Sequence, residues 1–178
     1  MNKKIIASAL SVALLFPATT SVGAAHYSGN DVQRETVASV GTTGSAKAAV
    51  AAHTLSAYEK EIVTLVNKER AKAGLKALAV DTQLSKVARL KSEDMYKLKK
   101  MSHSGTYGSP FDMMKKFGIT YRAAGENIAR GYRSPQEVMK GWMSSPGHRA
   151  NILNKRYTHI GVGHVASGNY WTQQFIQK

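Results

Sequence analysis

The chain contains no cysteine. This absence excludes a disulfide-stabilised scaffold, a thiol nucleophile and a zinc site built from cysteine sulfur atoms. Acidic residues are also few, with 11 Asp and Glu against 25 Lys and Arg, which gives a formal net charge of +14. A positive field of this strength favours anionic partners: nucleic acid, an acidic membrane surface or an anionic cell-wall polymer.

Long hydrophobic runs are missing too. The apolar run 5–16 is too short to span a bilayer as a helix, and no second such run follows it. It is preceded by Lys3 and Lys4 and followed by a proline and small residues up to Ala25, a pattern that predicts a secretory signal peptide over 1–25. The alternative is a retained N-terminal anchor.

Export narrows the choice of partner. Loss of the two leader lysines would lower the formal net charge from +14 by two, to +12. Because a secreted protein meets little nucleic acid, we expect an anionic cell-wall polymer or membrane surface as the partner, and no nucleic acid. We expect the mature chain to have no transmembrane segment and to be secreted or associated with the cell wall.

Common catalytic signatures are absent from the sequence. There is no Gly-x-Ser-x-Gly elbow, no phosphate-binding loop and no dinucleotide fingerprint. Ser104 follows His103 directly, but adjacency in sequence does not orient a hydroxyl for attack. Nucleophilic catalysis therefore has little support.

The composition divides the chain into three parts. After the leader, residues 26–53 are rich in Ala, Gly, Ser, Thr and Val, and their four charged residues cancel. This predicts a flexible linker or pro-segment without a core of its own. The hydrophobic content of 43% is ample for one folded domain, which we place at 54–178.

Helix-capping patterns recur along this domain. Each combines a Ser or Asp with the start of an apolar periodicity of about 3.6 residues. Asp112 and Glu137 follow such serines by three residues, which identifies them as capping-box partners. The second helix has an apolar inner stripe that ends at Leu98 and is interrupted at Lys91. The predicted caps are Ser56, Asp81 or Thr82, Ser109 and Ser134, and a last helical turn follows Ser145.

The C-terminal part changes its period. Residues 120–129 are predicted to be extended, and residues 160–165 alternate as a strand does. A turn at 167–169 and a returning strand at 170–176 complete a hairpin. Helices followed by an extended segment and a hairpin predict an α+β layered domain with an antiparallel sheet.

One acidic residue is the most suggestive candidate for chemistry. Glu126 lies in the apolar run 125–129, between segments that contain His103 and His148. A buried carboxylate must be paired, hydrogen-bonded or protonated, and neutral imidazole suits zinc. The three residues could therefore line one ligand cleft or hold a divalent metal such as zinc, with His103 and His148 as ligands and Glu126 as the catalytic candidate. Alternatively, each histidine caps or packs locally and Glu126 is a structural acceptor, because spacing alone does not show that the three converge.

Six segments occur in a characteristic order along the chain. They are Leu65-Val66-Asn67-Lys68-Glu69-Arg70, His103, Gly125-Glu126-Asn127-Ile128-Ala129, Trp142 with Ser145-Pro146-Gly147-His148-Arg149-Ala150-Asn151-Ile152-Leu153, Ile160-Gly161-Val162-Gly163, and Tyr170-Trp171-Thr172-Gln173-Gln174-Phe175. In this order they resemble the CAP superfamily, also called SCP or PR-1-like domains, and most of all its short secreted bacterial branch. The resemblance covers about Leu55 to Ile176.

The resemblance implies a three-layer α-β-α sandwich with a small central antiparallel sheet. In eukaryotic members, two histidines and two glutamates line a cleft that can hold a divalent metal. His103, Glu126 and His148 match three of these four, and Ser145 stands where the second glutamate usually falls. Members have been linked to lipid or sterol binding, signalling and defence, and proteolysis has also been proposed.

Three functions are therefore compatible with the sequence. The first is a secreted, non-enzymatic binding module at the bacterial cell envelope or in the extracellular space, with a cleft that a lipid or small apolar ligand could enter. The second is a metal-dependent, peptidase-like hydrolase in which Glu126 is the general base or a third ligand. The third is a purely structural role for the three residues.

Overall fold

The structure is a computed structural model that describes residues 6–12, by their backbone, and residues 53–178. Of the predicted signal peptide (1–25) the structure describes residues 6–12, and of the predicted linker (26–53) it describes residue 53; both stay predictions. Within the part that is described, no helix combines the length and the apolar character needed to cross a membrane.

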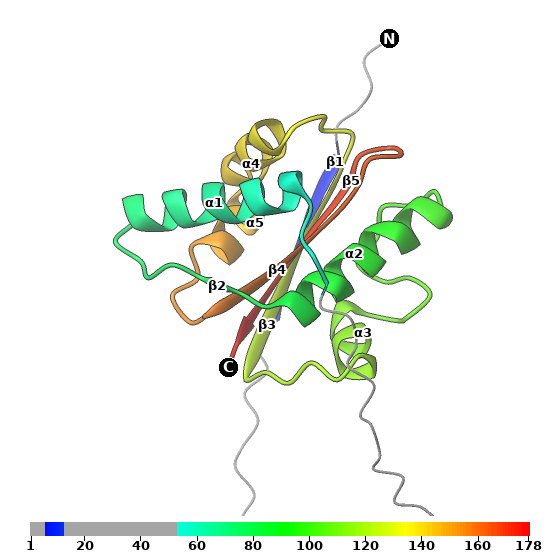
Figure 1. Ribbon diagram of the computed structural model, residues 1–178, viewed down its shortest axis with the longest axis horizontal. Helices are drawn as coiled ribbons and strands as arrows, with labels where there is room; N and C mark the ends of the chain where they lie inside the picture. The colour runs from blue at the N-terminus through cyan, green and yellow to red at the C-terminus, as the bar shows by residue number, and fades with distance from the viewer. Residues whose placement is uncertain (1–5, 13–52) are drawn as a thin grey trace, which may run out of the picture. The chain divides into compact units, whose positions relative to one another are not determined.

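Five helices and five strands are described. Residues 6–12 form one strand, and all other elements lie in the predicted domain (Figure 1). In chain order they are β1 (Ile6–Val12), α1 (Ala57–Lys72), β2 (Ala79–Val80), α2 (Thr82–Lys97), α3 (Pro110–Lys116), β3 (Ala123–Arg130), α4 (Pro135–Ser144), α5 (Pro146–Ile152), β4 (His159–Val165) and β5 (Tyr170–Gln177).

The helix starts follow the predicted capping residues. The Ser56 hydroxyl and the Glu59 carboxylate form a complete capping box at the start of α1, and Ser109 and Asp112 do the same for α3. Asp81 caps α2 through the Leu84 N–H. These local hydrogen bonds satisfy backbone donors that have no partner inside the helix, which fixes where each helix begins.

The cap of α4 differs from the prediction in one bond. The Ser134 hydroxyl accepts from the N–H of Glu137, as expected. The Glu137 carboxylate, however, accepts from the N–H of Arg133 at 2.8 Å, one residue before the cap. The carboxylate still satisfies a backbone donor at the helix start, so its capping role stands with a different partner.

The strands form one sheet in the order β1-β3-β5-β4-β2. The pairs β1–β3, β3–β5 and β4–β5 are antiparallel, and β4–β5 is the predicted hairpin. The short strand β2 pairs with β4 in parallel. The sheet is therefore antiparallel except at this two-residue edge.

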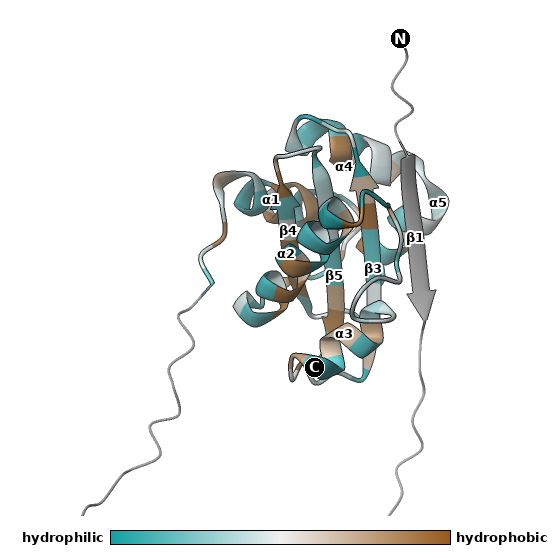
Figure 2. Cartoon of the chain, turned by 90° about the vertical axis from the view of Figure 1, so that its right-hand side faces the viewer, coloured by the Kyte–Doolittle hydropathy of each residue, from teal (hydrophilic) through white to brown (hydrophobic). Residues whose placement is uncertain are grey.

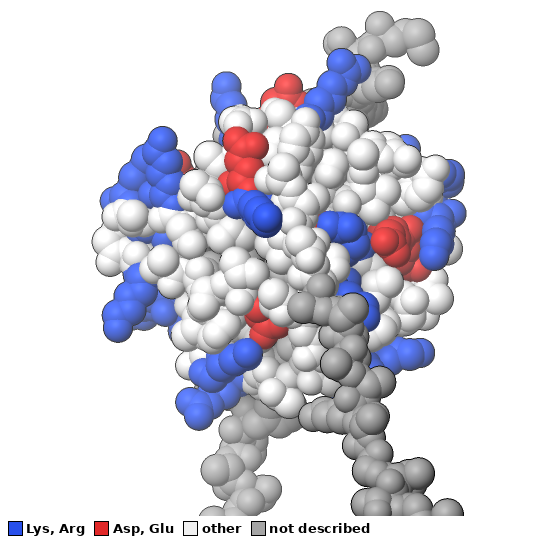
Figure 3. All heavy atoms as spheres, in the orientation of Figure 1, with Lys and Arg blue, Asp and Glu red and all other residues white. Residues whose placement is uncertain are grey.

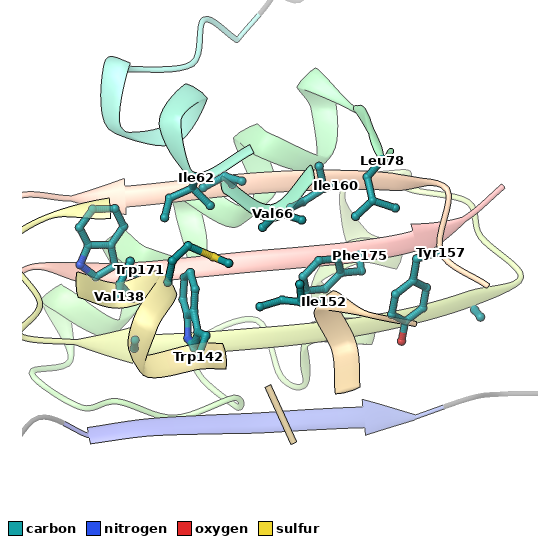
Figure 4. Packing of buried hydrophobic residues seen from close by; sticks show 14 residues of the cluster. Ile62, Val66, Leu78, Val138, Trp142, Ile152, Tyr157, Ile160, Trp171 and Phe175 are labelled. Carbon is teal, nitrogen blue, oxygen red and sulfur yellow. The ribbon is translucent and has the colours of Figure 1, made fainter. Parts of the chain in front are cut away.

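Helices cover both faces of the sheet, as the α-β-α sandwich requires (Figure 1). On one face, α1, α4 and α5 pack over a cluster that includes Ile62, Trp142 and Phe175 (Figure 4). On the other face, α2 and α3 pack over smaller clusters that include Leu84 and Met113. The fold class predicted from the sequence is confirmed.

Strand alternation assigns neighbouring residues of β3 to opposite layers. Ala123 and Ala129 belong to the cluster under α1, α4 and α5, whereas Ala124 and Ile128 belong to the clusters under α2 and α3. Because successive side chains of a strand point to opposite faces, Glu126 faces the α2 layer and Asn127 faces the α4 and α5 layer. Hydrophilic segments within β3 and β5 are visible in Figure 2.

The inner stripe of α2 is shorter than the sequence indicated. Leu84, Val87 and Met95 are buried, but Leu98 is 50% exposed. The helix ends at Lys97, and Lys99 adopts a positive φ of 52°. The chain thus leaves the helical path before Leu98 completes another turn, and the prediction for this residue was wrong.

Candidate functional site

Glu126 is fully buried in β3, and both of its carboxylate oxygens have polar partners. Oε1 lies 2.8 Å from Nδ1 of His103, and Oε2 accepts a hydrogen bond of 3.0 Å from the Gln174 side chain. Gln174 is directly opposite Glu126 in the β3–β5 register. Which of Oε1 and Nδ1 donates depends on the tautomer of the His103 ring.

His103 lies in the segment between α2 and α3. Its side chain is 14% exposed, so the His103–Glu126 pair is the part of this network that reaches the surface. The carbonyl oxygen of His103 accepts a 2.6 Å hydrogen bond from Nζ of Lys91, which holds this segment against α2. The site thus combines side chains from α2, the following loop, β3 and β5.

A second polar network lies on the opposite face of β3. The Asn127 amide donates to the carbonyl oxygen of His148 at 3.1 Å and to the Gln173 side chain at 3.0 Å. Asn151 of α5 donates to the side chain of Asn127 at 2.8 Å and to the carbonyl of Glu126 at 3.3 Å. These contacts position α5, and with it His148, against the backbone of β3.

The structure thus brings two of the three predicted residues into contact. His103 and Glu126 are in contact. His148 is buried in α5, and its carbonyl oxygen accepts a hydrogen bond from the Asn127 side chain. Across residues 53–178, no group of three or more His, Asp or Glu side chains is arranged to hold a metal ion. The convergence of all three in one cleft, and the metal-dependent hydrolase that depends on it, stay predictions.

Several residues of these networks were not found from the sequence. Lys91 stood out only as a charge within an apolar stripe, and that irregularity was the available signal. Gln173 and Gln174 form cross-strand pairs with Asn127 and Glu126, which depend on the register of two distant strands.

A further buried charge lies near the start of α1. Glu59 accepts hydrogen bonds from the N–H of Ser56, from the guanidinium of Arg89 and from the N–H of His164. Burial acts to raise the pKa of Glu59, but the hydrogen bonds from Arg89 and Ser56 outweigh it and hold the pKa below its ordinary value. This capping residue therefore also ties α1 to α2 and β4.

Within residues 53–178, three open depressions lie beside α4. One of about 620 Å³ is lined by Tyr132, Arg133, Glu137 and Lys140, among others. Two smaller ones, of about 300 and 360 Å³, lie where α4 meets α1 and α5. The larger depression contains basic side chains and does not include His103 or Glu126 in its lining.

Comparison with known proteins identifies the family. The family model for CAP, the cysteine-rich secretory protein family, matches residues 63–175. The chain belongs to the CAP family. It does so without cysteine, so this domain is held together by its core and polar networks rather than by disulfides.

Relatives of this CAP protein are found in bacteria. The uncharacterized protein YkwD of Bacillus subtilis (strain 168) is 55% identical over 161 residues, which are 90% of this chain and 61% of YkwD. An extracellular SCP-domain protein of Bacillus anthracis has a solved structure with a TM-score of 0.66 and 35% identity, covering 68% of this chain and 40% of that one. An outer surface protein of Borrelia burgdorferi shares the fold, with a TM-score of 0.63 and 20% identity over 67% of this chain and 91% of its own. The chain spans less than two thirds of the length of the first two.

The buried Glu126 network leads to a stability prediction. In the Glu126→Gln variant an amide NH₂ replaces one carboxylate oxygen. This NH₂ faces a side chain that donates to the carboxylate in the wild type, so one buried hydrogen bond is disrupted. We expect the free energy of unfolding to fall by about 1–3 kcal/mol. Urea denaturation at constant m-value measures the loss.

A matched control separates this effect from loss of charge alone. Glu93→Gln removes a carboxylate from the partly exposed face of α2 and should change stability by no more than about 0.5 kcal/mol. Equal stability of Glu126→Gln and the wild type would contradict a structural role for this carboxylate.

Proposed function

We propose that this CAP protein is a secreted, non-enzymatic binding module that attaches to phosphate-containing anionic polymers of the bacterial cell envelope. The observation that carries the proposal is the formal net charge, which is +14 for the whole chain and +12 without the two leader lysines. Lys and Arg side chains are spread over the face seen in Figure 3, with few acidic ones among them. Phosphate groups along a polymer match such a surface.

The relatives support an extracellular location. The solved Bacillus anthracis protein is described as extracellular, and the Borrelia burgdorferi protein as an outer surface protein. The apolar N-terminal run after two lysines agrees with export of this chain.

The depression beside α4 is the best candidate for the contact. Arg133 and Lys140 are exposed and line it together with Tyr132. Glu137 lies in the same depression, but its carboxylate is engaged by the N–H of Arg133. Two cations beside an aromatic ring suit a chain of phosphate groups, because Arg and Lys contact phosphate oxygens and the ring supports the polymer backbone.

Salt dependence tests the proposed attachment. We expect the purified protein to be retained on isolated cell walls at low ionic strength and to be released as sodium chloride rises from about 0.05 to about 1 M, because the screening length falls to roughly 3 Å. Pull-down of the protein with the walls measures retention. Walls stripped of their phosphate polymers should retain little. Retention that ignores salt, or that prefers anionic lipid vesicles to walls, contradicts the proposal.

Charge-matched variants locate the contact. The double variant Arg133→Gln/Lys140→Gln should weaken retention roughly tenfold. Lys97→Gln/Lys100→Gln removes the same charge from the exposed end of α2 and should have a smaller effect. Equal losses would show a diffuse electrostatic attraction without a specific site beside α4.

A further inference from the structure

Lys91 is an ammonium group buried in the interior of a strongly basic protein. It is 2% exposed, on the face of α2 that also carries Leu84, Val87 and Met95. Lysine is almost never fully buried unless it is paired. Its burial therefore requires specific partners inside the domain.

Those partners belong to the network around Glu126. Nζ of Lys91 donates to the carbonyl oxygen of His103 at 2.6 Å, and the ring of the same histidine contacts Glu126 at 2.8 Å. Burial lowers the pKa of the Lys91 amine, and the negative charges of Glu126 and Asp94 oppose this lowering. Lys91 is thus placed where it balances two carboxylates.

The loop above Lys91 fits closely over these charges. Asp94, one turn further along α2, accepts from the N–H of Thr106 at 3.1 Å. A Cβ atom on Gly105 would overlap the Asp94 carboxylate and lie 3.5 Å from Nζ of Lys91. The glycine therefore lets the loop lie close to the ammonium group and Asp94.

The donors present do not fit the divalent metal that the CAP fold implies. Ser145 stands where a second glutamate would supply a carboxylate, and both oxygens of Glu126 already have hydrogen-bond partners. A cation entering beside Glu126 would also approach the buried charge of Lys91, and like charges repel strongly where water is excluded.

We propose that Lys91 takes the place of a metal ion in this CAP domain: its ammonium group balances Glu126, holds the His103 segment and makes the site reject divalent cations. Lys91 is thereby a specificity-determining residue for the cleft. The inference is independent of the proposed attachment to the envelope, since it concerns the interior of the domain and not its basic surface.

Zinc binding by the purified protein tests this inference. In isothermal titration calorimetry we expect Lys91→Met to bind Zn²⁺ at least tenfold more tightly than the wild type, because a side chain of similar length then carries no charge. Lys86→Met, on the exposed face of the same helix, should bind as the wild type does. In the Lys91→Met background, Glu126→Gln should abolish the gain, which places the metal at Glu126.

Two results would contradict this role of Lys91. If Lys91→Met fails to fold by circular dichroism, Lys91→Gln serves instead, since its amide can still donate to the carbonyl of His103 without a charge. Equal zinc affinity of the folded variant and the wild type overturns the proposal. Tight zinc binding by the wild type also overturns the proposal if His103→Ala abolishes that binding. This second test needs no Lys91 variant.

Discussion

Replacement of Gly163 by alanine is expected to destabilise the domain by roughly 3 kcal/mol or more. A Cβ atom at this position would overlap the backbone of Ala88 and Arg89 in α2. Backbone atoms in the middle of a helix cannot rotate away as a side chain can, so the whole helix must move off the sheet. Overpacking of this kind costs about 1–3 kcal/mol where side chains can adjust, and more where they cannot.

Gly161 makes the same contact one helical turn earlier. Its Cβ atom would overlap the backbone of Leu84 and Ser85. Two glycines, two residues apart on one face of β4, thus allow α2 to lie directly on the strand. Since domains are stable by only about 5–15 kcal/mol, the double variant Gly161→Ala/Gly163→Ala should fail to fold.

A control substitution distinguishes close packing from the general effect of adding a methyl group. Gly131 has a positive φ of 94° and no atom within 4 Å of its ideal Cβ position. Gly131→Ala should therefore cost only the backbone strain, about 1–2 kcal/mol. Thermal and urea denaturation compare the variants. A Gly163→Ala protein as stable as Gly131→Ala would mean that α2 can shift without loss.

The close contact of α2 with β4 also determines the candidate site. α2 carries Lys91, and Ser92 bonds to the carbonyl of Gly163 at 3.1 Å and to the hydroxyl of Thr172 at 2.8 Å. A helix lifted by one methyl group would separate Lys91 from the His103 segment. In a partly folded Gly163→Ala variant, we therefore expect the Glu126 network to be lost together with the α2 packing.

Features that depend on a few neighbouring residues were predictable from the sequence. The caps at Ser56, Asp81, Ser109 and Ser134 are confirmed because a side chain there reaches a backbone N–H three residues on. The β4–β5 hairpin is confirmed for a similar reason, since turn residues and alternation are local. The layered fold followed from the order of the CAP motifs.

Features that depend on distant partners were not predictable. Arg89 of α2 forms an ion pair with the buried Glu59 of α1, a partner that belongs to another helix. Lys91 looked like an interruption, because the carbonyl and carboxylates around it come from other segments. Gly161 and Gly163 could be placed on one face of a strand, but the helix that needs them there appears only in the tertiary structure.

In the candidate site, too, local features could be predicted and features that depend on distant segments could not. From the sequence, Glu126 was a carboxylate in an apolar run that requires a partner, and whether a histidine supplies it stayed open. In the structure Glu126 is buried and contacts His103. The sequence did not reveal that α5 lies on the other face of the sheet from His103. That separation follows from strand alternation at Glu126 and Asn127 once the helices are assigned to layers.

Arg70 provides the second large expected effect, and it concerns the segment that carries His148. The side chain is 1% exposed and extends from the end of α1 to four carbonyl oxygens. It donates to Lys76 at 2.9 Å, Ile152 at 2.8 Å, Asn154 at 2.9 Å and Tyr157 at 3.5 Å. One guanidinium thus holds the chain from α5 to β4 against α1.

Arg70→Met should lower the free energy of unfolding by about 3–5 kcal/mol. Methionine fills much of the space but leaves buried carbonyl oxygens without donors, and each such group costs about 1–3 kcal/mol. The stability of Arg70→Lys should lie between that of Arg70→Met and that of the wild type, since a single ammonium group cannot reach carbonyls in four directions. Lys72→Met, exposed on the same helix, is the control and should change stability by about 0.5 kcal/mol or less.

Hydrogen exchange can show whether this loss is local. If Arg70 anchors the segment, amides of α5 and of the turn before β4 should lose protection in Arg70→Lys before those of β3 and β5 do. Because α5 positions His148 beside Asn127, this opening would loosen one side of the candidate site while the His103–Glu126 contact remains. Uniform loss of protection across the sheet would instead show that Arg70 supports the whole domain, and that α5 has no separate stability to lose.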